Sequence, residues 1–376
     1  MDGTDMRSSP LGRSDSTVAV TARPCEREHA VTNAQVKTPA RGLGPSECHR
    51  HRNPFQTSRC VIDTRFGQPH IAFGGANRTG RRVSYFQAIV IGILQGITEL
   101  FPVSSLGHSV LVPGWFGWNS LVVGESADKS FYLAFLVGLH VATAIALLVF
   151  FRSDWARIIR GFFTSIRDRR IDNADQRMAW LLVLGTLPVG IVGLVFEHGL
   201  RTLFAKPLAA AIFLTGNGCI LLVGEHLQRR VAHRTPPTGK SGDAVEGSLG
   251  TGSSVNTTDA LIVGSAQIAA LFAGISRSGS TIVAGLLRGL DHEDAARFSF
   301  LLATPVIFAA GLYKLPDLFG HLGDGIRGQL LVGSIVAGIS AYLAVRFLTR
   351  FFHKRTLVPF AVYCLLAGIA SIIKFA

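Results

Sequence analysis

Long apolar blocks separated by shorter polar segments run through the chain from about residue 83 to its end. Six of these blocks hold about 20 residues, the length that an α-helix needs to cross the hydrocarbon core of a bilayer. The pattern therefore predicts an all-α, polytopic membrane protein. The six predicted spans are residues 131–151, 178–198, 207–227, 293–315, 329–351 and 357–375.

Two further apolar regions, residues 86–118 and 260–290, are interrupted by glycine, proline and polar residues. Each half has about 10–15 residues, which gives about 15–22 Å of helix and does not cross a core of about 30 Å. Such interrupted pairs are typical of re-entrant hairpins, whose polar tips are buried in protein or line a cavity. The alternative for either region is one tilted and kinked helix.

The order of these segments repeats along the chain. One hairpin and three spans are followed by a second hairpin and three more spans. Because three is an odd number, the second unit starts on the opposite side of the membrane. The sequence therefore predicts two inverted-topology repeats, at about residues 83–227 and 259–376, whose broken tips meet near the midplane.

Two polar stretches flank these repeats. Residues 1–82 are rich in Ser, Thr, Arg and Pro and lack apolar periodicity, so we expect a disordered, basic N-terminal extension. Val83 opens the apolar region as a membrane protein's own N-terminus would, and a misassigned start is therefore the alternative. Residues 228–258 are rich in Gly, Ser, Pro and Thr and are expected to form a flexible cytoplasmic loop between the repeats.

The distribution of charge predicts how the chain is oriented. The net charge is +13, which in a soluble protein would suggest nucleic acid, but only 16% of the residues are charged and 48% are hydrophobic. The cations lie in polar segments next to apolar spans, so membrane orientation explains them and no nucleic-acid partner is expected. Alternate connections hold most of them, at residues 152–177, 228–258 and 350–355, and these should be cytoplasmic.

The second hairpin tip has the composition of an anion site. Arg277 supplies a planar, forked cation that suits phosphate oxygens, and it stands at the expected start of a helix, where several backbone amides lack partners. The alternative is a helix N-cap with an arginine that extends to the membrane surface. The hydroxyl donors expected here are Ser276, Ser278 and Thr281.

The first tip carries Glu99, Ser105 and His108 within an apolar setting. A carboxylate, a hydroxyl and an imidazole are the parts of an activated nucleophile or of a general acid–base pair. Gln95 lies one helical turn before Glu99 and shares its face. Polar packing between helices is the alternative, and it is stronger for Gln95 and Ser104 than for Glu99 and His108.

Together the tips suggest a phosphorylated lipid as the substrate, because both lie within apolar regions. His140 lies inside a predicted span and is expected to be a satisfied interhelical histidine rather than a catalyst. No P-loop is present, so nucleotide-driven chemistry is not supported.

Two segments carry a resemblance to a known family. "QGITELFPVSSLGH", residues 95–108, and "AGISRSGST", residues 273–281, closely resemble the two signature segments of the undecaprenyl-diphosphate phosphatases, the bacitracin-resistance proteins. The likeness covers residues 83–376. It implies an integral enzyme of the bacterial plasma membrane that hydrolyses undecaprenyl diphosphate to undecaprenyl phosphate and inorganic phosphate at the outer face. This reaction recycles the lipid carrier of peptidoglycan synthesis and confers bacitracin resistance.

The resemblance also implies roles for the residues of both tips. Ser105 would be the nucleophile, activated by Glu99 or His108, or else Glu99 would orient an attacking water. A divalent cation, Mg²⁺ or Ca²⁺, would assist near Glu99, although Gln95 stands where a second carboxylate is an option in the family. The catalytic set is Glu99, Ser105, His108 and Arg277, and the substrate-binding set is Gln95, Ser104, Ser276, Ser278 and Thr281.

Two other classes of membrane protein share features with this chain. Type-2 phosphatidic acid phosphatases need a histidine six residues after their motif arginine, and this chain has Val283 there, so that class is excluded. A lipid-phosphate transporter or flippase is the alternative, because inverted repeats around a midplane site are what secondary transporters use. A homodimer is among the oligomeric states that the sequence allows.

Overall fold

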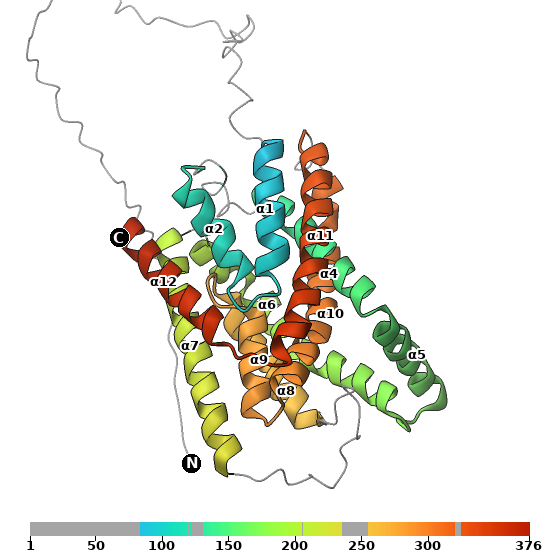
Figure 1. Ribbon diagram of the computed structural model, residues 1–376. Coiled ribbons are helices and arrows are strands. Elements are labelled where there is room, and N and C mark those ends of the chain that lie inside the picture. Colours follow the sequence, from blue (N-terminus) through green and yellow to red (C-terminus); the bar gives the residue numbers. More distant parts are fainter. Residues whose placement is uncertain (1–82, 119–120, 122–130, 205, 235–254, 320–324) are drawn as a thin grey trace, which may run out of the picture. The chain divides into compact units, whose positions relative to one another are not determined.

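A computed structural model describes residues 83–118, 121, 131–204, 206–234, 255–319 and 325–376. The predictions for residues 1–82 and for most of the 228–258 loop lie outside these residues. Helices are the regular elements of the described part (Figure 1). Six are long and apolar enough to cross a membrane, which confirms the predicted spans. They are α4 (Phe131–Phe150), α6 (Ala174–Phe204), α7 (Pro207–Arg234), α10 (His292–Phe319), α11 (Arg327–Phe352) and α12 (Val358–Phe375).

Both interrupted regions form pairs of short helices rather than single kinked ones. The first pair is α1 (Tyr85–Thr98) and α2 (Ser105–Trp115). The second pair is α8 (Thr257–Ala266), extended by a 3₁₀ turn, and α9 (Arg277–Leu287). Serine or asparagine caps the start of each helix, because its side-chain oxygen accepts a hydrogen bond from an amide of the first turn. The opposite orientation of the two halves stays a prediction.

The first helix of each pair packs against a long helix from the other half of the chain: α1 contacts α11, and α8 contacts α6. Glycines allow both approaches. A Cβ atom at Gly92 of α1 would lie 2.6 Å from the carbonyl oxygen of Gly333, and one at Gly264 of α8 would lie 2.2 Å from that of Gly185. The two halves therefore interlock rather than pack as separate bundles.

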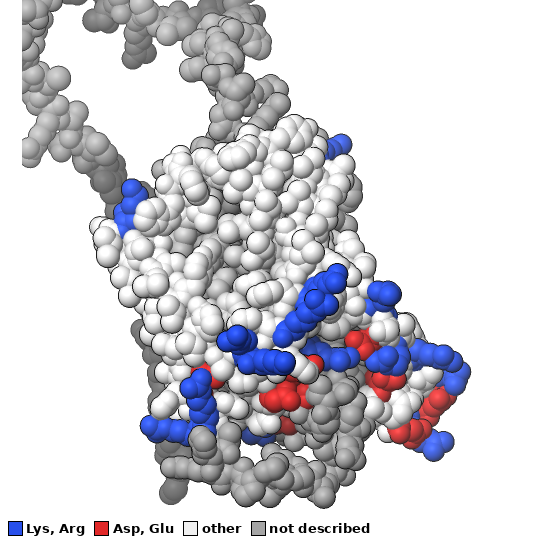
Figure 2. Space-filling model, viewed as in Figure 1, with Lys and Arg blue, Asp and Glu red and all other residues white. Residues whose placement is uncertain are grey.

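The cation-rich connection after α4 is largely helical, which the sequence analysis did not predict. It contains α5 (Arg152–Asp168), an amphipathic helix that stands beside the other helices in Figure 1. Asp154, Ile158, Gly161 and Ser165 form its buried face at helical spacing. Its remaining positions mix arginines with exposed apolar residues such as Ile159 and Phe163. The helix contributes to the band of cations that Figure 2 shows at one end of this face of the molecule.

The two hairpin tips contact each other. A Cβ atom at Gly107, in the first turn of α2, would lie 2.8 Å from the Cα atom of Gly274 in the second tip. Gly274 also has a φ of +113°, which a residue with a side chain rarely adopts. Glycine at these positions therefore lets two polar turns from distant parts of the sequence come together.

Candidate active site

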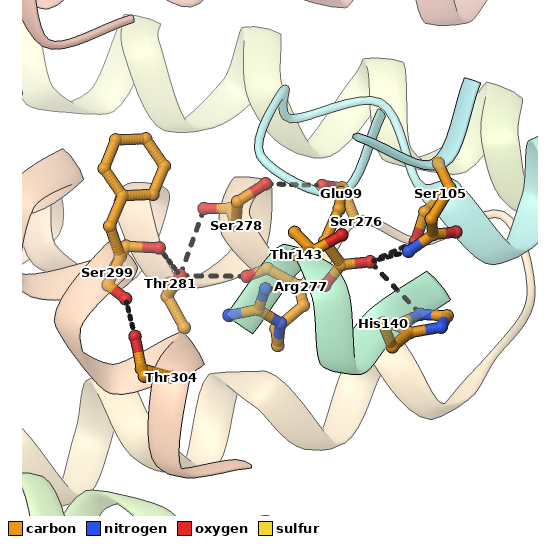
Figure 3. Close-up of polar contacts among 12 residues, drawn as sticks. Glu99, Ser105, His140, Thr143, Ser276, Arg277, Ser278, Thr281, Ser299 and Thr304 are labelled. Carbon is orange, nitrogen blue, oxygen red and sulfur yellow. Dashed lines mark hydrogen bonds and ion pairs between the residues drawn. The ribbon is translucent and has the colours of Figure 1, made fainter. Parts of the chain in front are cut away.

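Glu99 is the centre of the polar cluster between the tips (Figure 3). It caps the C-terminus of α1, and only 7% of its surface is exposed. Its Oε2 atom accepts a hydrogen bond from Ser105 Oγ at 2.5 Å and one from Gln95 Nε2 at 3.1 Å. A hydroxyl this close to a carboxylate forms one of the stronger hydrogen bonds in proteins. The predicted shared face of Gln95 and Glu99 is thus present.

Arg277 approaches the other oxygen of the same carboxylate. It is the first residue of α9, and its Nη2 atom lies 2.7 Å from Glu99 Oε1. Its second terminal nitrogen, Nη1, is buried and has no hydrogen-bond partner among the described residues. A buried guanidinium nitrogen without a partner is costly, because it has lost its hydration without gaining an acceptor. The site therefore presents a spare donor for an anionic oxygen.

His140 also reaches Glu99, and the sequence did not reveal this. Its Nε2 atom, on α4, lies 3.2 Å from Glu99 Oε2, and its Nδ1 atom lies 2.8 Å from the carbonyl oxygen of Leu136. Both ring nitrogens face oxygen acceptors, and only the imidazolium form donates to both. The histidine is satisfied between helices, as expected, but its partner is the central carboxylate.

Ser104 shapes the turn that presents Ser105. It is the N-cap of α2 and has a φ of 70°, a left-handed backbone conformation that is uncommon outside glycine. Its Oγ atom accepts hydrogen bonds from the amides of Gly107 and Gly274, both at 3.2 Å. The strained turn is thus fixed by bonds to both tips, and it places Ser105 at the start of α2 beside Glu99.

Asn217 fastens the tips together, a role that the sequence analysis did not identify. This fully buried residue of α7 donates from Nδ2 to the carbonyl oxygen of Pro102 at 2.9 Å, and its Oδ1 atom accepts from the amide of Ser276 at 3.0 Å. One side chain therefore binds the first tip and the second tip at once. A single asparagine inside an apolar span was the available signal.

Ser276, Ser278 and Thr281 were predicted to bind substrate, and the structure gives each a structural partner. Ser276 Oγ accepts from the amide of Gly279 at 3.1 Å, and Ser278 Oγ donates to the carbonyl oxygen of Phe101 at 3.1 Å. Thr281 is fully buried and turns away from Glu99, toward Ser299 (Figure 3). Several backbone amides at this tip were expected to lack hydrogen-bond partners. The amides of Ser276 and Gly279 instead donate to Asn217 Oδ1 and Ser276 Oγ.

His108 does not join Glu99 and Ser105. Its Nδ1 atom lies 2.7 Å from the carbonyl oxygen of Ser104, and its Nε2 atom lies 2.8 Å from the hydroxyl of Tyr363 on α12. The two rings also stack, with their centroids 5.7 Å apart. His108 thus supports the Ser104 turn by linking it to Tyr363 of α12.

A cavity of about 260 Å³ opens at the Glu99 cluster. Its polar wall includes Glu99, Ser105, His140, Ser276 and Arg277, whereas most of the remaining wall is aliphatic. Polar groups gathered at one end of an apolar cavity are typical of a site for an amphipathic ligand. The cavity suits a charged head group attached to a hydrocarbon chain.

The cluster does not fit a metal ion held by protein ligands alone. Both oxygens of Glu99 already accept hydrogen bonds from positively charged or polar donors. The described residues contain no group of three or more His, Cys, Asp or Glu side chains placed to hold a metal. Glu99 is also the one carboxylate among the residues that line this cavity.

Comparisons with known proteins agree on one family. The sequence model of the family described as "Bacitracin resistance protein BacA" matches residues 88–370. The "Undecaprenyl-diphosphatase 2" of Frankia alni is 55% identical over 338 residues, and that of Burkholderia ambifaria is 44% identical over 288 residues. The "Undecaprenyl-diphosphatase" of Mycolicibacterium paratuberculosis is 57% identical over 299 residues. The matches cover 78%, 76% and 78% of this chain and 98%, 95% and 98% of the respective relatives.

Proposed function

The chain belongs to the family of bacitracin resistance proteins BacA, and from that premise we propose that it hydrolyses undecaprenyl diphosphate to undecaprenyl phosphate and inorganic phosphate. It is a multi-pass membrane protein. In this role it returns a lipid carrier to peptidoglycan synthesis and confers resistance to bacitracin. The observation that carries the proposal is the buried, unpartnered Nη1 of Arg277 beside the Ser105–Glu99 pair.

Arg277 is proposed to bind the diphosphate. Its free Nη1 donates to a phosphate oxygen, and the guanidinium contributes a permanent positive charge in a site from which water is largely excluded. Positive charge from His140 supports the same anion. The aliphatic wall of the cavity receives the first isoprenyl units, and the rest of the chain runs into the bilayer, because about 260 Å³ is too small for it.

Ser105 is proposed to attack the terminal phosphorus. Its proton passes to Glu99 Oε2, the acceptor that already lies 2.5 Å away. The bond from Oγ to phosphorus forms while the bridging P–O bond breaks, and undecaprenyl phosphate leaves with the electron pair. Water then hydrolyses the phosphoserine, which releases inorganic phosphate and restores the hydroxyl. In the alternative route, Glu99 orients water for direct attack on the same phosphorus.

A divalent cation, Mg²⁺ or Ca²⁺, is proposed to enter with the substrate. Magnesium commonly binds through substrate phosphates, water and one or two carboxylates rather than in an all-protein cage. The diphosphate oxygens would supply most of its ligands, because the oxygens of Glu99 are engaged by Ser105, Gln95, His140 and Arg277. When bound, the cation would neutralise charge on the phosphates.

The reaction is proposed to take place at the outer face of the plasma membrane. This follows from the positive-inside rule, which puts the cation-rich connections on the cytoplasmic side and both ends of the first hairpin outside. Access from that side would let the enzyme act on carrier lipid released after cell-wall polymerisation.

Phosphate release by the purified protein tests the proposal. The protein in detergent, given undecaprenyl diphosphate and Mg²⁺, should release one inorganic phosphate per lipid, and the lipid product should be the monophosphate. A protein that binds the lipid at the Arg277 cavity without releasing phosphate would instead be a carrier. A substrate labelled with ³²P in its terminal phosphate also tests the covalent route. If that route operates, a rapid acid quench should trap the label on Ser105.

A further inference from the structure

A second group of basic residues lies around the C-terminal end of α11, apart from the catalytic cavity. Arg346 and Arg350 lie one turn apart on the helix, and Lys354 and Arg355 follow just after it ends. All four are exposed. They line a groove of about 460 Å³ together with Leu343, Phe347 and Phe351, and no carboxylate lies among its lining residues. We call this the α11 groove.

The four cations of the α11 groove lack acidic partners among the described residues. Elsewhere in the described part, Arg157, Arg229, Arg288 and Arg297 each form an ion pair with Asp or Glu. Like charges one helical turn apart destabilise a helix slightly. The positive-inside rule explains why cations occur at this end of the molecule (Figure 2), but it does not require four of them to face one groove.

An apolar groove continues from this basic one. It has a volume of about 480 Å³, lies between α4 and α11, and shares Leu343 with the α11 groove. Ile335, Ile339 and Leu343 follow each other at every fourth position and are all exposed. Eight residues of helix span about 12 Å, which is most of the depth of one leaflet, about 15 Å. The combined surface therefore has a charged end and a hydrocarbon-compatible end.

We propose that the α11 groove binds one anionic phospholipid of the adjacent leaflet. The phosphate lies among Arg346, Arg350, Lys354 and Arg355, and one acyl chain follows the apolar groove between α4 and α11. Guanidinium groups match phosphate oxygens in pairs, and a cluster of Lys and Arg at the cytoplasmic end of a membrane helix is suited to anionic lipid head groups. A zwitterionic lipid would bring its own cation into a groove that offers no carboxylate for it.

Native mass spectrometry tests the proposal with phosphatidylglycerol and phosphatidylcholine as probes. After transfer from mixed micelles, the wild-type protein should retain one tightly held phosphatidylglycerol and no phosphatidylcholine. The variant R346Q/R350Q/K354Q/R355Q should lose it. The matched control, R152Q/R160Q/R169Q/R170Q, removes the same charge from α5 and the residues after it and should retain the lipid. Retention by the first variant, or equal loss from the control, would overturn the proposal.

A second measurement keeps every cation and does not depend on the fold of the quadruple variant. Leu343→Trp places an indole where the basic and apolar grooves meet. In vesicles, brominated phosphatidylglycerol should quench this added fluorescence at a mole fraction at least about fivefold lower than brominated phosphatidylcholine, the effect of one interfacial cation. Equal quenching by the two lipids would show that the groove has no preference for the anionic head group and would contradict the proposal.

Discussion

Glu99 Oε1 lies 2.7 Å from Arg277 Nη2, and this ion pair joins two polar turns that are 178 positions apart in the sequence. Both side chains are largely buried. The pair holds the hairpins in contact, yet it uses only one of the two terminal nitrogens of Arg277. A diphosphate can therefore bind Arg277 at its free nitrogen, or compete with Glu99 for the other, without dismantling the turns.

Ser105 and Glu99 should act as one catalytic unit. We expect Ser105→Ala and Glu99→Gln each to lower kcat by at least about 100-fold, the size of a lost acid–base contribution. The double variant should be little worse than either single variant, because both remove the same proton transfer. Gln95→Ala removes a hydrogen bond to Glu99 but no reacting group, and should cost much less. A Ser105→Ala enzyme with near-normal kcat would assign the attack to water.

His140 should matter through its contact with Glu99. We expect His140→Ala to lower kcat by about 10- to 100-fold, since it removes a donor from the central carboxylate. His140→Gln keeps a side-chain amide donor and should recover part of this loss. Thr143→Val, one turn along α4, removes a hydroxyl that bonds within its own helix and is the matched control. Equal kcat values for His140→Ala and Thr143→Val would contradict the assignment.

Asn217 should couple stability to activity. Asn217→Ala leaves the carbonyl of Pro102 and the amide of Ser276 without their partner, and each buried unsatisfied group costs about 1–3 kcal/mol. We expect a clear fall in Tm together with a lower kcat. Asn217→Asp keeps an acceptor for the amide of Ser276 but loses the amide donor to the carbonyl of Pro102. Its kcat should lie between that of the wild type and that of Asn217→Ala. Thermal unfolding and phosphate release on the same preparations check this. A wild-type Tm and kcat for Asn217→Ala would show that the two tips stay in contact without the hydrogen bonds of Asn217.

His108 should act by positioning. Its ring bonds to Ser104 and Tyr363, so Tyr363→Phe tests the Nε2 side alone. We expect Tyr363→Phe to cost about 1 kcal/mol of stability and less than about tenfold in kcat. His108→Ala should cost more, because it also releases the Ser104 turn. If Tyr363→Phe were as damaging as Ser105→Ala, the imidazole would take part in the reaction itself.

The sequence predicted the architecture well because hydropathy reports which segments cross the membrane. It also indicated Glu99, Ser105 and Arg277, since polar groups stand out in apolar segments. It did not reveal the partners of His140 and Asn217, because one polar residue in a span does not show which distant turn it faces. The direction in which the His108 side chain points depends on the left-handed backbone conformation of Ser104, which no local sequence preference predicts. Helix α5 was missed because its many cations obscured a buried face at helical spacing.

The geometry of Arg277 tests the central claim most directly. Lysine keeps the positive charge but loses the fork that reaches Glu99 with one nitrogen and substrate with the other. Losing these contacts should cost about 2–4 kcal/mol in the transition state, or about 30- to 1000-fold in rate. The measurement is phosphate release from undecaprenyl diphosphate by purified, folded Arg277→Lys protein, with Arg170→Lys as the control. We predict a severe loss for Arg277→Lys, a greater one for Arg277→Ala and none for the control. A wild-type rate for Arg277→Lys would show that charge alone suffices and would contradict a shaped anion site.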